Sequence, residues 1–184
     1  MHLTTRRSQR DQVQFFNRLL SLVGHLFLHG GFFHVLGNMV FLWVFGNAVC
    51  AKLGNLWYVP AYLGLGILAA LTHLAFDGAP AIGASGAING IVGTFVVFYP
   101  LNEISCFTIF LLRVFKFSVS SYWLVLFWLV FDIIGAAFLA EGGVAYAAHI
   151  GGLAAGVAAG LLLLKLDVLR ENKFEMSLRQ ILKL

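Results

Sequence analysis

The chain has 184 residues, of which 60% are hydrophobic and 11% are charged, and its mean hydropathy is +0.90. An ordinary soluble domain has about 45–50% apolar and about 25% charged residues, so this composition excludes a water-soluble globular protein and a disordered chain. The net charge of +4 does not indicate a nucleic-acid partner, because the 12 Lys and Arg residues are spread between apolar segments and the tails. We expect the basic residues to reflect membrane topology.

Five apolar segments are long enough to cross a membrane as helices, for which about 20 residues are needed. The N-terminal 21 residues are polar and lack the apolar core of a signal peptide. The segment Leu101–Phe117 carries Glu103, Arg113 and Lys116, so we expect an interfacial connection there. The five expected spans are Phe33–Leu53, Leu56–Phe76, Ile82–Tyr99, Tyr122–Ala140 and Val144–Leu164.

These segments predict an all-α integral membrane protein. Residues 1–32 are expected to form a polar N-terminal tail and external loop, and residues 33–164 a transmembrane domain with five transmembrane helices. The tail at 165–184 mixes leucines with charges, which is typical of an amphipathic surface helix. No internal repeat is visible, and this disfavours a transporter built from duplicated halves.

The distribution of basic residues predicts the orientation. With five spans, Lys52, the 101–117 connection and the C-terminal tail share one side and hold 8 Lys and Arg residues. The connections around Asp77 and Glu141 hold none. By the positive-inside rule the C-terminus is cytoplasmic. The N-terminal tail, with four Arg residues, then falls on the other side, and one explanation is that this chain lacks a preceding span.

Polar residues within the expected spans gather near the outer face. His34 and Asn38 lie four residues apart on one face of the first span, Ser85 lies in the first turn of the third, and His149 lies near the start of the fifth. A polar side chain in hydrocarbon needs a partner. We therefore expect these groups to form one shallow site.

The residue types suit acyl transfer. A serine hydroxyl needs a base within hydrogen-bond reach to act as a nucleophile, so Ser85 and His149 are expected to form a catalytic dyad. An Asn amide, a His N–H and a backbone N–H at a helix start can stabilise an oxyanion. We assign this role to Asn38, His34 and the amide of Ser85.

Glycines at four-residue spacing accompany the third and fifth spans. Such small-xxx-small series let helix backbones approach closely and would bring Ser85 within reach of His149. The pattern is common in membrane helices, and helix association alone explains it equally well. The series are Gly86 and Gly90 in one span and Gly152, Gly156 and Gly160 in the other.

Three motifs together resemble the rhomboid family of intramembrane serine proteases: HGGFFHVLGN, GASG, and AH followed by GGxxxG. The resemblance covers about Leu26–Leu164. It implies a Ser/His protease that cleaves transmembrane protein substrates within the lipid bilayer, with Ser85 as nucleophile, His149 as general base and no cofactor. It also implies a bacterial-type protein of the plasma membrane with its active site facing outside.

The chain departs from the family pattern in three places. The family usually has six spans, Leu20-Ser21 stands where a Trp-Arg pair is common, and Asn89 stands one turn after the serine, where an aromatic often packs on the histidine. Asn89 can hydrogen-bond in the cavity instead. Gly86 is a further supporting candidate.

Two other polar residues receive structural interpretations. His29, four residues after His25, is expected to stabilise the loop or line the water entrance, because no Cys or carboxylate stands nearby to complete a metal site. Asp132 could be a third catalytic residue, but span order favours a hydrogen-bonded polar group near the outer third of its span.

One other function is compatible with the sequence. A rhomboid-like protein without catalytic activity would serve as a membrane-protein binding module, although such proteins usually lack the serine or the histidine, and both are present here. A small channel is disfavoured because the polar groups lie on one side at a shallow depth. The substrate and the oligomeric state are not indicated.

Overall fold

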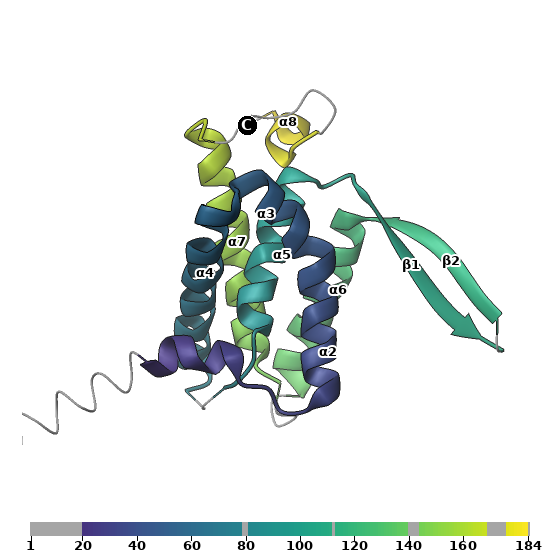
Figure 1. The fold of residues 1–184 in the computed structure, drawn as a ribbon. Coiled ribbons are helices and arrows are strands. Elements are labelled where there is room, and N and C mark those ends of the chain that lie inside the picture. The colour runs from purple at the N-terminus through teal and green to yellow at the C-terminus, as the bar shows by residue number, and fades with distance from the viewer. Residues whose placement is uncertain (1–19, 79–80, 112, 140–143, 169–175, 184) are drawn as a thin grey trace, which may run out of the picture.

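The computed structural model describes residues 20–78, 81–111, 113–139, 144–168 and 176–183. It is a bundle of helices with a two-stranded hairpin projecting beside it and a short helix at one end (Figure 1). In chain order the elements are η1 (His25–Phe27), α2 (Phe32–Phe41), η2 (Leu42–Gly46), α3 (Asn47–Leu53), α4 (Asn55–Phe76), α5 (Ser85–Phe98), β1 (Glu103–Phe110), β2 (Arg113–Ser120), α6 (Ser121–Phe138), α7 (Tyr146–Lys165) and α8 (Leu178–Leu182).

The expected spans are confirmed. Among the described residues, four helical segments are long and apolar enough to cross a membrane: Phe32–Leu53, Asn55–Phe76, Ser121–Phe138 and Tyr146–Lys165. The first combines α2, a π-helical stretch (η2) and α3. The third span is the shorter apolar helix α5, which begins three residues later than predicted and ends before Pro100.

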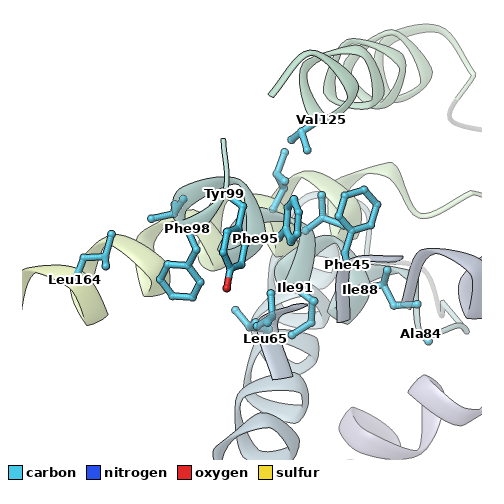
Figure 2. Close-up of a cluster of buried hydrophobic side chains, with 14 residues drawn as sticks. Phe45, Leu65, Ala84, Ile88, Ile91, Phe95, Phe98, Tyr99, Val125 and Leu164 are labelled. Carbon is cyan, nitrogen blue, oxygen red and sulfur yellow. The ribbon is translucent and has the colours of Figure 1, made fainter. Parts of the chain in front are cut away.

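Helix α5 lies at the centre of the bundle. Most of its residues are buried, and its aromatic rings join side chains from neighbouring helices in the main apolar cluster (Figure 2). Phe95 contacts Phe45 of the first span, with ring centroids 5.1 Å apart. The outer helices leave many large apolar side chains exposed, as expected for surfaces that face lipid.

Glycines bring α5 and α7 together at backbone distance. A Cβ atom on Gly152 would overlap the carbonyl oxygen of Gly86, and one on Gly156 would overlap that of Gly90. The Thr94 hydroxyl lies 3.1 Å from the carbonyl oxygens of both Gly90 and Gly156, so it links the two helices. The glycine spacing of the sequence therefore corresponds to a close helix–helix contact.

The segment after α5, which was predicted as an interfacial connection, contains two strands. Strands β1 and β2 form an antiparallel hairpin in which Glu103 pairs with Ser120 and Phe110 with Arg113. Its sequence alternates polar and apolar residues near the bundle, which favours strands over a helix. The chain is thus a helical bundle with one hairpin rather than purely helical.

The C-terminal segment contains a short helix, as expected for the tail, but Lys165 ends α7 rather than starting the tail. Ser177 and Gln180 form a capping box at the start of α8. Arg179 Nη1 donates a hydrogen bond of 2.7 Å to the carbonyl oxygen of Leu164. This contact attaches α8 to the end of α7, and residues 1–19 of the predicted N-terminal tail lie outside the described part.

Candidate active site

The antiparallel order of the helices brings the predicted site residues to one end of the bundle. Helices α2, α5 and α7 all begin at the end opposite to α8 (Figure 1). His34 lies in the first turn of α2, Ser85 is the first residue of α5, and His149 lies in the first turn of α7. Three segments that are distant in the sequence therefore contribute to one shallow site.

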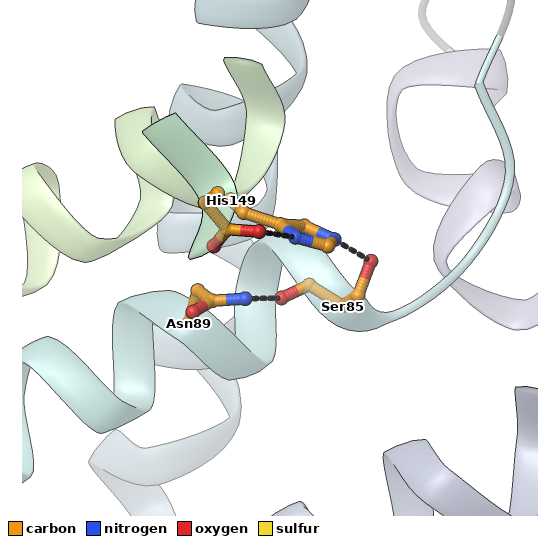
Figure 3. A network of polar contacts seen from close by, with 4 residues as sticks. Ser85, Asn89 and His149 are labelled. Atoms are coloured by element: carbon orange, nitrogen blue, oxygen red, sulfur yellow. Dashed lines mark hydrogen bonds and ion pairs between the residues drawn. The ribbon is translucent and has the colours of Figure 1, made fainter. Parts of the chain in front are cut away.

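Ser85 and His149 are in direct contact. The distance from Ser85 Oγ to His149 Nε2 is 2.8 Å, within hydrogen-bond range (Figure 3). Both residues are partly buried. Because the glycine contacts hold α5 against α7 immediately beside this pair, the hydroxyl and the imidazole are fixed by backbone packing.

The second nitrogen of the same imidazole contacts Asp132 of α6. His149 Nδ1 lies 2.9 Å from Asp132 Oδ1, and the two side chains are 16% and 14% exposed. The sequence indicated that Asp132 would be a hydrogen-bonded polar group, but it did not identify its partner. The structure joins Ser85, His149 and Asp132 in one linear network.

His34 lies against the turn that precedes Ser85. Its Nδ1 accepts a hydrogen bond of 3.3 Å from the Gly30 N–H, which leaves the proton of a neutral ring on Nε2. A Cβ atom on Gly83 would lie 2.9 Å from His34 Cε1 and 3.9 Å from Ser85 Oγ. Gly83 also has a φ of +125°, so glycine is required for this turn and for the approach of the histidine.

Asn38 points one unpaired donor into the site region. The side chain is 7% exposed, and within the described part of the chain its Nδ2 is a buried nitrogen without a hydrogen-bond partner. The backbone N–H groups in the first turn of α5, starting with that of Ser85, have no acceptor within their own helix. Asn38 of α2 and Ser85 at the start of α5 line the same cavity.

The three supporting candidates occupy different positions. Asn89 Nδ2 donates to the carbonyl oxygen of Ser85 at 3.0 Å (Figure 3). Gly86 packs against α4 and α7, where a Cβ atom would lie 2.8 Å from that of Ala69. His29 lies edge-on to His34, with ring centroids 5.2 Å apart, and it does not line the cavity described next.

A cavity of about 870 Å³ opens beside the network. It is lined mainly by apolar side chains, as is usual for ligand sites, and Ser85, His149, Asp132, His34 and Asn38 all reach it. Aromatic side chains of α2 and α6 form much of its wall: Phe33, Phe41, Trp128 and Phe131.

Sequence reasoning did not identify three residues that line this cavity: His73, Asp77 and Tyr146. His73 of α4 is buried beside Asp77, with Nδ1 3.7 Å from Asp77 Oδ2. Tyr146 lies edge-on to His149, with ring centroids 6.4 Å apart. In the family an aromatic one turn after the serine often packs on the histidine, and in this chain Tyr146 lies against the His149 ring instead. The sequence indicates this contact only through the position of Tyr146, three residues before His149.

The fold and the site together define a helical membrane protein with a partly buried hydroxyl–imidazole–carboxyl network. A family model, described as the Rhomboid domain, matches residues 16–166. This match covers most of the chain, so the chain belongs to the rhomboid family.

Several curated proteins are similar to the chain. Rhomboid protein 1, mitochondrial, of Saccharomyces cerevisiae is 33% identical over 149 residues, which are 77% of this chain and 41% of the yeast protein. Rhomboid protease GluP of Bacillus subtilis is 36% identical over 72 residues, 39% of this chain and 14% of GluP. The presenilin-associated rhomboid-like protein, mitochondrial, of Mus musculus is 27% identical over 146 residues, 71% of this chain and 34% of the mouse protein. The chain spans less than half the length of each of these relatives.

Proposed function

We propose that this rhomboid-family protein is an intramembrane serine protease. The observation that carries the proposal is the 2.8 Å contact between Ser85 Oγ and His149 Nε2 beside an apolar cavity. A hydroxyl in contact with an imidazole is the arrangement that nucleophilic acyl transfer needs. One of the relatives carries the name of a rhomboid protease, which agrees with the proposal.

The reaction follows from the roles of these groups. Ser85 Oγ attacks the carbonyl carbon of the scissile peptide bond while its proton passes to His149 Nε2. The oxyanion receives hydrogen bonds from the backbone N–H of Ser85, Asn38 Nδ2 and His34 Nε2. His149 then gives the proton to the leaving amine, the C–N bond breaks, and a water molecule hydrolyses the ester on Ser85.

The substrates in this proposal are transmembrane segments of other proteins. The cavity lies near one end of a bundle whose helices are of membrane length, and it is largely apolar, so a locally unwound segment of a membrane protein suits it better than a soluble peptide. Lys52 lies in the last turn of α3 and Lys165 ends α7, both at the opposite end of the bundle. By the positive-inside rule the C-terminus then lies on the cytoplasmic side of the membrane, and the site faces the opposite side.

The test uses the full chain in proteoliposomes with a transmembrane reporter protein. Ser85→Ala and His149→Ala are each expected to reduce cleavage by about 10⁴-fold or more, because neither group can replace the other. Ser118→Ala, a change to an exposed serine of β2, is the matched control and should cleave at the wild-type rate. Cleavage by Ser85→Ala at the wild-type rate, or binding of the reporter without cleavage by the wild-type chain, would contradict the proposal, and the latter result indicates a binding module.

A further inference from the structure

Asp132 is a carboxyl group in the C-terminal half of α6, an otherwise apolar membrane helix. An ionisable side chain within a membrane span is costly, and such residues usually have a specific partner. The partner here is the catalytic imidazole proposed above: Asp132 Oδ1 lies 2.9 Å from His149 Nδ1. Both nitrogens of the His149 ring are engaged, one by the carboxyl group and one by Ser85 (Figure 3).

The carboxyl group decides which ring nitrogen carries the proton. A neutral imidazole has one N–H and one acceptor nitrogen, and an acceptor at Nδ1 keeps the proton there. Nε2 then presents its lone pair to the Ser85 hydroxyl, as proton abstraction requires. Within the described residues Asp132 is the group in contact with Nδ1 that selects this tautomer and holds the ring plane.

We propose that Asp132 is a positioning residue that holds His149 in the reactive tautomer, so that this chain uses three residues rather than the Ser/His pair alone. The inference rests on the proposed protease function, because only a reacting Ser85 makes the tautomer matter. Asp132 touches neither Ser85 nor the scissile bond and acts through the imidazole.

A second contact one turn away supports the geometry. Tyr146 lies three residues before His149 on α7, and Gly135 lies three residues after Asp132 on α6. A Cβ atom on Gly135 would overlap the Tyr146 ring, so the glycine lets α6 approach α7 at this level. The close approach of α6 to α7 at Gly135 therefore also brings the Asp132 carboxyl group within reach of the His149 imidazole.

Three other titratable groups line the cavity: His34 of α2, His73 of α4, and Asp77, which follows α4. With Tyr146 of α7 they complete the titratable groups that line the cavity with Asp132 and His149 within the described residues. His73 and Asp77 contact each other. Asp132 is therefore the carboxyl group that the geometry assigns to His149.

The test compares Asp132→Asn, which keeps the volume and the polarity of the side chain, with Asp132→Ala. Both variants are expected to lower kcat by about 10²–10⁴-fold with KM unchanged. In Asp132→Asn the amide can place an N–H against Nδ1 and so move the ring proton to Nε2. In Asp132→Ala the acceptor that keeps the proton on Nδ1 is removed. Ile133→Ala, a change to an exposed neighbour on the same helix, is the control for α6 and should keep the wild-type kcat.

A measurement independent of cleavage uses protein labelled with ¹⁵N in its six histidine rings. The His149 signals are assigned by their loss in His149→Gln. We expect a protonated Nδ1 and an unprotonated Nε2 in the wild type, and a changed tautomer in Asp132→Asn.

Wild-type kcat in Asp132→Asn, or an unchanged ring spectrum despite a lower kcat, would overturn the inference. If Ser85→Ala is inactive at the same time, the proposed protease function still stands. If the wild-type chain does not cleave the reporter, the protease proposal fails, and an unchanged spectrum in Asp132→Asn would reject the positioning role separately.

Discussion

Two pairs of helices build the candidate site, and they are held in place very differently. Helices α5 and α7 carry Ser85 and His149 and touch through backbone at their glycines, and most of α5 is buried. Helices α2 and α6 carry Asn38 and Asp132. In α2 only Asn38 is buried among its described residues, and in α6 the buried residues are Ser121, Val125 and Gly135.

The difference separates two kinds of contribution. The nucleophile and the base are placed by an interface on which the fold itself depends. The groups that would stabilise charge and orient the base are placed by helices in which most residues are exposed. Substitutions in the first pair should therefore affect folding and activity together, whereas those in the second pair should affect activity with little effect on stability.

The largest effect is expected from Gly156→Ala in the α5–α7 interface. The added Cβ atom would overlap the backbone of Gly90, so we expect a loss of at least about 3 kcal/mol of stability and no measurable cleavage. Gly64→Ala in α4 is the matched control, because a Cβ atom there meets nothing within 4 Å, and helix propensity predicts a gain of about 0.5–1 kcal/mol. Thermal unfolding in detergent measures both, and equal midpoints would show that the interface is not close-packed.

Asn38→Ala tests the second pair at α2. Loss of an oxyanion donor typically lowers kcat by about 10²–10³-fold. Because Asn38 Nδ2 has no partner within the described residues, we expect the unfolding midpoint to stay close to that of the wild type. Wild-type kcat in a steady-state cleavage assay would remove Asn38 from the proposed mechanism, and a large loss of stability would contradict the distinction between the two pairs.

Gly135→Ala tests the second pair at α6. The new Cβ atom would displace the Tyr146 ring or move α6 away from α7, which lengthens the contact between Asp132 and His149. If Asp132 moves by less than 1 Å relative to His149, we expect kcat to fall about tenfold, with KM and stability nearly unchanged. Equal kcat in Gly135→Ala and Gly64→Ala would indicate that the approach of α6 is not required.

The smallest effect is expected from Thr94→Val. The change removes the hydroxyl that bonds the carbonyl oxygens of Gly90 and Gly156, while the branched shape is kept. Hydrogen bonds between membrane helices contribute about 0.6 kcal/mol on average, so we expect a loss of about 0.5–1 kcal/mol and unchanged kcat. A loss as large as that of Gly156→Ala would mean that the hydroxyl, rather than glycine packing, holds the interface.

Much of this arrangement could be predicted from the sequence because membrane helices follow simple rules. Apolar length located the five spans, and the order of spans placed His34, Ser85 and His149 at one end. The hairpin was missed because an apolar segment with charges was interpreted only as an interfacial connection, although Glu103–Cys106 and Lys116–Ser120 alternate as strands do.

The contacts of His149 with Asp132 and Tyr146 could not be predicted in the same way. They depend on the rotation of α6 about its own axis and on its distance from α7, which Gly135 and Tyr146 determine through packing. Hydropathy identifies a span but not the face that it turns to a neighbour. The burial of His73 beside the cavity was missed for the same reason.

The most direct test of the central claim is labelling by a serine-directed fluorophosphonate, followed by peptide mass spectrometry. An activated Ser85 predicts a single adduct on the peptide that contains Ser85 in the wild-type chain, a much slower reaction in His149→Ala and no reaction in Ser85→Ala. A folded wild-type chain that remains unlabelled at Ser85, or one that labels at the same rate without His149, would contradict the account.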